Sequence, residues 1–194
     1  MDNIIKPKKN LNLYKALEIG YLRDENKQKK RLKRFGYKLV PDLTTREHLV
    51  AINPENKKLL YISNGTDFSN SDDVQYDILG AVGSQQNSKR MKEEKNALLK
   101  AKQTLKPKDV TLVSHSLGSQ FTNYIASPGD RVIQANPFYT AGAKARPNVE
   151  NYRTKLDVVS AFAPKENTTL INSKNYNPLS THNINEFKNV PVYV

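Results

Sequence analysis

The sequence predicts an α/β fold with a mostly parallel central sheet flanked by helices. Runs of apolar and β-branched residues alternate along the chain with helical stretches, and this alternation is typical of a parallel sheet. The chain has 194 residues, enough for one domain with a substantial core but not for a large cap domain. We expect a basic helical segment at residues 1–35, packed on or beside the core, and the main domain at residues 36–194.

Local patterns predict the individual elements. Apolar side chains recur near helical spacing in the first helix, and the longest helix is rich in Lys, Glu, Ala and Leu before Pro107 follows it. The predicted helices are residues 10–22, 25–35, 72–82, 87–105 and 116–126. Predicted strands are residues 47–53 and 57–63, which form a hairpin, a strand beginning at residue 110, and residues 131–135 and 152–156.

Ser116 is the predicted nucleophile. Residues 110–119 read Val-Thr-Leu-Val-Ser-His-Ser-Leu-Gly-Ser, so an apolar run leads directly into a serine with small neighbours. This is the layout of a nucleophile elbow, where the chain turns from strand to helix around a serine. Ser114 and Gly118 are small enough for such a turn. For the pentapeptide alone, an ordinary strand-to-helix turn is an equally good interpretation.

A serine hydroxyl becomes a good nucleophile only when a base accepts its proton. The chain has three histidines. His115 adjoins the nucleophile and should point away from it, and His48 lies in a predicted strand, where a structural role is expected. His182 lies in a polar loop near the C-terminus, where the chain order Ser, acid, His places the base. We therefore predict that His182 is the base.

The acid of the triad follows by elimination. Catalytic groups of an open α/β sheet gather at the carboxyl ends of the strands, so an acid that follows a strand is favoured. Asp130 precedes a predicted strand, whereas Asp157 follows residues 152–156. We predict Asp157, with a solvated loop aspartate or a helix N-cap as the alternative. The carboxylates between nucleophile and base are Asp130, Glu150, Asp157 and Glu166.

An oxyanion hole needs backbone N–H groups aimed at the developing negative charge. The N–H of Leu117, directly after the nucleophile, is one predicted donor, and the N–H of Thr66 is the other. Thr66 belongs to the Asn-Gly-Thr-Asp segment after a predicted strand, for which a simple turn is the alternative. Phe138 and Tyr139 follow a strand at the same edge and are predicted to contact substrate.

Several segments together resemble the class 3 lipase family of the α/β-hydrolases. The resemblance extends from about residue 32 to residue 187 and keeps the family's motif order. It implies a minimal α/β-hydrolase fold and a serine esterase or lipase that needs no cofactor. The matching segments are residues 61–67 (the strand with R-G-T-D), 73–83, 110–119 (the G-H-S-L-G-G elbow), 156–160 (the acid) and 180–184 (the histidine).

Three positions depart from the family pattern. Asn64 stands where the family has the arginine of R-G-T-D, and an amide mimics that bidentate cation only in part. Ser114 and Ser119 replace two elbow glycines, which puts close strand-to-helix packing in doubt. These departures support a second hypothesis, a catalytically weak or inactive lipase-like protein with a structural or binding role, for example as a component of a virion.

The formal net charge of +12 favours anionic partners. For the chain as a whole, a bias toward Lys and Asn explains the charge equally simply. The segment from Lys27 to Arg34 (Lys-Gln-Lys-Lys-Arg-Leu-Lys-Arg) is different, because a helix there is cationic on most faces. An anionic membrane surface or nucleic acid would fit it, without specific base reading, since no aromatic residues are interleaved.

The composition argues against a membrane-spanning, disulfide-bonded or zinc-binding protein. No apolar run approaches the roughly 20 residues of a membrane-spanning helix, and the N-terminus lacks the apolar core of a signal peptide. We therefore expect a cytoplasmic or particle-associated protein. The chain has no cysteine, and its three histidines are scattered. This excludes disulfides and gives no zinc-binding pattern, so neither a metal nor another cofactor is expected.

Overall fold

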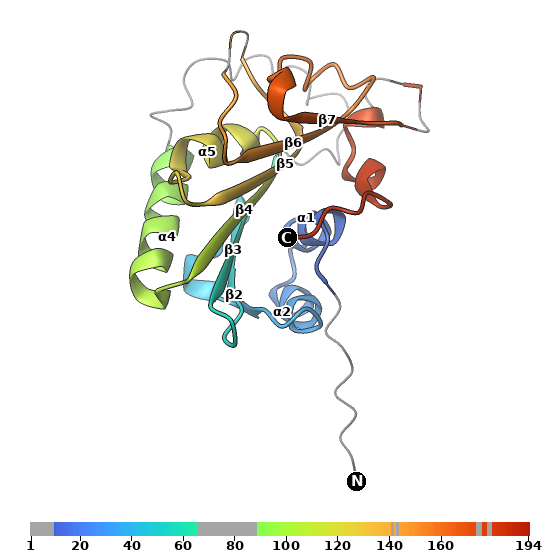
Figure 1. Ribbon diagram of the computed structural model, residues 1–194. Helices are drawn as coiled ribbons and strands as arrows, with labels where there is room; N and C mark the ends of the chain where they lie inside the picture. Colours follow the sequence, from blue (N-terminus) through green and yellow to red (C-terminus); the bar gives the residue numbers. More distant parts are fainter. Residues whose placement is uncertain (1–9, 66–88, 141, 143, 174–175, 178–179) are drawn as a thin grey trace.

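A computed structural model describes residues 10–65, 89–140, 142, 144–173, 176–177 and 180–194. Within them, seven strands form one sheet in the order of the sequence (Figure 1). The first three strands pair antiparallel, and the pairs from the third strand onward are parallel. The strands are β1 (Lys38–Leu39), β2 (His48–Ile52), β3 (Lys58–Ser63), β4 (Asp109–Ser116), β5 (Arg131–Pro137), β6 (Val149–Thr154) and β7 (Thr168–Ile171).

Helices cover both faces of the sheet. Figure 1 shows α1 (Leu13–Gly20) and α2 (Glu25–Lys33) on one side, and α4 (Lys89–Leu105) and α5 (Gly118–Ile125) on the other. The fold is therefore an α/β fold with a mostly parallel sheet, as predicted. Short 3-10 helices are η1 (Pro41–Leu43), η3 (Lys165–Asn167), η4 (Ser180–His182) and η5 (Ile184–Phe187). No helix among the described residues is both long and apolar enough to span a membrane.

Side-chain caps start the two N-terminal helices. The Asn12 side chain accepts a hydrogen bond from the Lys15 N–H, and the Asp24 side chain accepts one from the Lys27 N–H. Each cap satisfies a backbone donor that the first helical turn leaves without a partner. The predicted helices at 10–22 and 25–35 are therefore present, trimmed at their ends to the residues that continue the helical hydrogen bonds.

The alternation of side chains along the strands divides the core into two layers. In β3, Leu60 and Ile62 face the layer under α1, whereas Leu59 and Tyr61 face the layer under α4. Successive side chains of a strand point to opposite faces, so a strand covered on both sides is apolar throughout. This explains why residues 59–62 (Leu-Leu-Tyr-Ile) read as a continuous apolar run.

Several sequence-based boundaries need correction. The strand predicted at residues 152–156 is β6 at Val149–Thr154, and the short strands β1 and β7 were not predicted. Tyr124 of α5 is half exposed, although its spacing in the predicted helix 116–126 favours packing on the sheet, because it falls on the outer side of the helix. The helix predicted at 72–82 lies outside the described residues.

Candidate active site

Ser116 occupies a strained turn at the end of β4. Its φ is +53°, a left-handed conformation that costs a non-glycine residue energy and persists only where the surroundings impose it. The helix α5 begins two residues later, at Gly118. A strand, a serine with positive φ and an immediate helix are the geometry of a nucleophile elbow.

Two glycines allow the backbone to close around this turn. A Cβ on Gly118 would lie 2.3 Å from the carbonyl oxygen of Ser63, so only glycine fits between α5 and β3. A Cβ on Gly65 would lie 2.7 Å from the Cβ of Ser116. The segment after β3 therefore approaches the serine directly. Thr66, the second predicted oxyanion donor, lies outside the described residues.

The three predicted triad side chains meet. The distance from Ser116 Oγ to His182 Nε2 is 2.7 Å, and from His182 Nδ1 to Asp157 Oδ2 it is 3.0 Å. A carboxylate only accepts, so Nδ1 carries the proton and Nε2 is free to accept the serine O–H. All three residues are buried, with at most 3% of any of them exposed. This is the arrangement of a Ser-His-Asp triad.

Hydrogen bonds keep Asp157 ionised. Burial by itself raises the pKa of this carboxyl, but the bonds from His182, from the Ser160 hydroxyl and from the Val159 N–H outweigh it, so the pKa is lowered. Arg153 donates to the Asp157 backbone carbonyl at 2.9 Å. The acid is therefore fixed in position and remains available to orient the imidazole.

The backbone around His182 is also fixed. The carbonyl oxygen of Thr181 accepts bonds of 2.8 Å from the Asn136 side chain and from the Thr154 hydroxyl. The carbonyl oxygen of Asn136's side chain in turn accepts the Thr154 N–H at 2.8 Å. The ends of β5 and β6 thus hold the loop that carries the imidazole.

His115 contacts the backbone of the loop that carries His182 and links this loop to the C-terminal end of α1. Its Nε2 lies 2.8 Å from the carbonyl oxygen of His182, so Nε2 carries the proton and Nδ1 accepts. The Tyr21 hydroxyl, 2.8 Å from Nδ1, is therefore the donor, and its oxygen accepts the Gly65 N–H at 2.9 Å. One tyrosine thereby joins the β3 loop to the histidine loop.

His48, for which a structural role is predicted, and Asp130, which the sequence places at the other edge of the sheet, make no contact with the triad that the structure records. His48 stacks on the Tyr61 ring with 5.4 Å between ring centroids, and burial lowers its pKa to about 4. Burial and the nearby His182 lower the pKa of His115 to about 3. Asp130 pairs with Lys102 at 2.6 Å, at the opposite end of the sheet from the triad.

Hydrogen bonds surround the three positions that differ from the class 3 lipase pattern. The amide of Asn64 donates to the backbone carbonyls of Gly20 and Arg46, and Arg90 of α4 donates to the Asn64 carbonyl. A cation from a helix thus contacts the backbone at the end of β3. Behind the elbow, the Ser114 hydroxyl lies 2.9 Å from that of Thr122 and 3.4 Å from that of Ser119.

The two residues predicted to contact substrate, Phe138 and Tyr139, have different surroundings in the structure. Phe138 packs against Leu117 and Val159, and its N–H donates to the Ser116 carbonyl, so it lies beside the nucleophile. Tyr139 is buried, and its hydroxyl donates to Gln134 Oε1 at 2.9 Å, with Asn151 Oδ1 3.3 Å away in the interior. Its polar group is therefore committed to the core, and Phe138 is the better placed of the two.

Sequence reasoning missed the residues that position the triad. Asn136 has a positive φ of 41° at the end of β5, and Tyr21, the residue directly after α1, contacts His115 and Gly65. No local pattern separates such residues from other polar side chains. Among the described residues, no group of three or more His, Cys, Asp or Glu side chains is arranged to hold a metal ion.

Comparisons with known proteins bear on the fold alone. No protein-family model matches the chain, and a search of curated proteins found no relative. Two solved structures that it resembles are the native Rhizomucor miehei lipase propeptide complex and a deletion mutant of that complex. Each is 14% identical with a TM-score of 0.55, and the alignments cover 82–83% of this chain. The chain spans 65–66% of the length of those two chains.

Proposed function

We propose that this protein is a serine hydrolase of the α/β-hydrolase type, similar to class 3 lipases, that cleaves carboxylic esters. The observation that carries the proposal is the continuous hydrogen-bonded series from Ser116 through His182 to Asp157. The left-handed φ of Ser116 supports it independently, because an ordinary strand-to-helix turn does not require that strain.

In the proposed reaction, His182 Nε2 takes the proton of Ser116 as Oγ bonds to the ester carbonyl carbon. The imidazolium then gives that proton to the leaving alcohol as its C–O bond breaks, which leaves an acyl group on Ser116. Water, deprotonated by His182, attacks the acyl carbon. The bond between that carbon and Ser116 Oγ then breaks, Oγ takes back the proton from the imidazolium, and the acid is released. Asp157 stays ionised throughout and stabilises the imidazolium.

Negative charge develops on the carbonyl oxygen in both steps. The N–H of Leu117, at the start of α5, is one proposed donor to this oxygen, and the N–H of Thr66 is the other. The close approach of Gly65 to Ser116 supports the assignment, since it brings the β3 loop next to the nucleophile.

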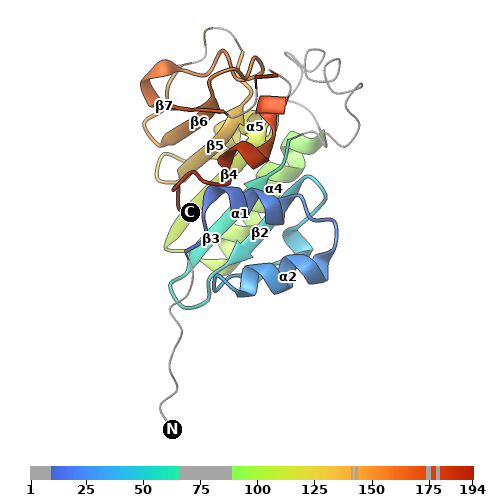
Figure 2. The same cartoon turned by 90° about the vertical axis from the view of Figure 1, so that its right-hand side faces the viewer.

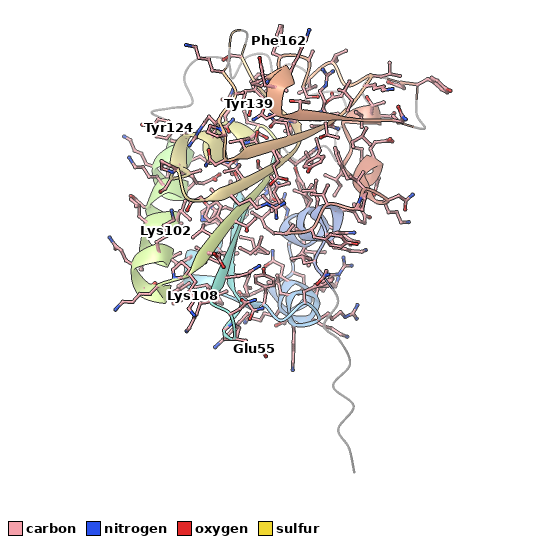
Figure 3. The ribbon with its side chains drawn as sticks, in the orientation of Figure 1. Glu55, Lys102, Lys108, Tyr124, Tyr139 and Phe162 are labelled. Atoms are coloured by element: carbon pink, nitrogen blue, oxygen red, sulfur yellow. The ribbon has the colours of Figure 1, made fainter. Side chains whose placement is uncertain are left out.

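Lipid esters are the proposed substrate class. The loop that carries Asp157 exposes three large apolar side chains, Leu156 (42% exposed), Val158 (59%) and Phe162 (59%). Figure 3 shows Phe162 at the upper edge of the molecule, on the same side as Tyr139. Apolar side chains gathered beside a site favour contact with an acyl chain or a lipid surface over a small polar ester.

The test compares the wild-type protein with the Ser116→Ala variant. We expect the wild type to react with a fluorophosphonate and to hydrolyse nitrophenyl esters, with long acyl chains cleaved faster than acetate. Ser116→Ala should lose labelling and reduce kcat by about 10⁴-fold or more, while circular dichroism stays unchanged. Absence of labelling in the folded wild type would instead favour an inactive lipase-like protein with a structural role.

A further inference from the structure

An open groove of about 600 Å³ lies between α1 and α2, on the face of the sheet opposite α4 and α5. Figure 2 shows the two helices side by side in front of the sheet. The groove shares no residue with the triad. Five cationic side chains line it: Lys15, Lys27, Lys30, Arg31 and Arg34.

Four of these cations form one stripe along α2 and its C-cap. Lys27, Lys30, Arg31 and Arg34 follow the i, i+3, i+4, i+7 spacing of a single helix face. Basic residues in the last turn of a helix also complement its dipole. The helix dipole does not explain why these cations lie on one face of α2. It also does not explain the position of Lys15, which lines the groove from α1.

The positive charge of the groove is largely uncompensated. Glu18 is the one carboxylate among the residues lining the groove, and it is shared by Lys15 at 2.7 Å and Arg31 at 2.9 Å. Lys27 also lies 3.9 Å from Asp24, which is outside the groove. Five cations and these two carboxylates leave an excess of three positive charges. Lys30 and Arg34 are exposed, and among the described residues neither takes part in an ion pair.

The dimensions and chemistry point to a phosphate-bearing ligand. Guanidinium and ammonium groups together bind phosphate oxygens well, through forked and single donors respectively. Arg34 lies seven positions after Lys27, so the stripe is about 10 Å long at the rise of an α-helix. That length exceeds one phosphate group and accommodates two.

We propose that the α1–α2 groove binds a compact anion that carries two phosphate groups, either a free pyrophosphate-like ester or a phosphorylated lipid headgroup. The half-buried Phe35 and the buried Ile19 also line the groove. The proposal does not depend on the catalytic one, because the groove is separate from the triad.

The test uses two double variants with the same change in net charge. Lys30→Ala with Arg34→Ala removes two groove cations that have no ion pair among the described residues. Lys92→Ala with Lys100→Ala removes two exposed cations from α4, on the opposite face of the sheet. Pyrophosphate is titrated by calorimetry at about 0.15 M salt, where long-range attraction is screened. Vesicles of phosphatidylcholine, with and without phosphatidylinositol bisphosphate, are tested by co-sedimentation.

The groove variant should bind pyrophosphate or bisphosphate-containing vesicles about tenfold or more weakly than the wild type, and the α4 variant should match the wild type. Binding of pyrophosphate alone identifies a free phosphate ester, and binding of the vesicles alone identifies a lipid headgroup. Equal loss in both variants would overturn the proposal, because net charge would then suffice. Absence of wild-type binding to either ligand, or groove-dependent binding of a duplex oligonucleotide instead, would also overturn it.

Discussion

The polar groups at the triad end of the sheet and those of the α1–α2 groove differ in burial and in hydrogen bonding. Ser116, Asp157 and His182 are buried and joined to one another by hydrogen bonds. Lys30 and Arg34 in the groove are exposed and have no ion pair among the described residues. At the triad end, folding buries polar groups and fixes them in place through hydrogen bonds. In the groove, the cationic side chains stay in contact with solvent.

This difference separates two kinds of site. A buried polar group is costly unless it is hydrogen-bonded, so its partners are fixed wherever it persists. Such a region suits a reaction that needs positioned atoms. Exposed cations cost little and act through their combined field, which suits recognition of a charged group and tolerates motion. Perturbing the triad end should therefore change stability or turnover, whereas perturbing the groove should change binding alone.

The largest expected effect comes from Gly118→Ala. The new Cβ would meet the Ser63 backbone carbonyl at 2.3 Å, and neither α5 nor β3 can move away without disturbing the core. We expect a loss of about 3 kcal/mol in the free energy of unfolding, measured by urea denaturation. Gly129→Ala is the matched control, since a Cβ there has no atom within 4 Å. Equal stability of the two variants would contradict the close packing of the elbow.

Acidification should destabilise the protein through its buried histidines. Burial lowers the pKa of His48 to about 4 and that of His115 to about 3, against 6.5 for an ordinary histidine. The unfolded chain therefore binds more protons below pH 6.5, and stability falls as the pH drops from 6.5 toward 4. Between pH 7 and pH 5 the loss should be roughly 2 kcal/mol per histidine.

Urea unfolding at several pH values measures this dependence. A His48→Asn variant should lose about half of it, because only His115 then titrates abnormally. Asp157 adds no loss in this range, since its lowered pKa keeps it ionised, and its contribution disappears only at lower pH. A wild-type stability that is the same at pH 7 and pH 5 would show that neither histidine is held neutral.

A smaller effect is expected from Tyr21→Phe. The change removes the donor to His115 and the acceptor of the Gly65 N–H, so both the loop that carries His182 and residues 64–65 after β3 lose a constraint. We expect kcat to fall about tenfold with KM nearly unchanged, the size of one or two lost hydrogen bonds. Tyr37→Phe, which removes a hydroxyl with no hydrogen bond among the described residues, should leave kcat unchanged. ¹⁵N NMR of the His115 ring offers a readout that does not need turnover.

The sequence was informative where local chemistry is distinctive. The apolar runs of β3 and β4, the elbow around Ser116, and the choice of Asp157 over Asp130 could all be predicted, because each depends on residues close in the chain. β1 and β7 could not, since Lys38–Leu39 and Thr168–Ile171 are short and only partly apolar. They become strands because a neighbouring strand offers hydrogen-bond partners.

The positioning residues could not be predicted for a related reason. Asn136, Thr154 and Tyr21 are ordinary polar residues in the sequence. Their roles arise from contacts with residues 27 to 45 positions away, as in the bonds from Thr154 and Asn136 to Thr181 and from Tyr21 to Gly65. The same is true of Arg90, which supports the carbonyl of Asn64 from another helix.

The amino-acid sequence by itself determined the α/β class, the strand-turn-helix at the serine, and the concentration of charge between residues 27 and 34. These depend on side-chain periodicity and composition, which act over a few residues. Only the tertiary structure decided that Ser116, Asp157 and His182 meet, that His115 faces a carbonyl rather than the nucleophile, and that four cations of α2 share a groove with Lys15. Contacts between distant segments depend on how the sheet and helices pack, and no local pattern contains that packing.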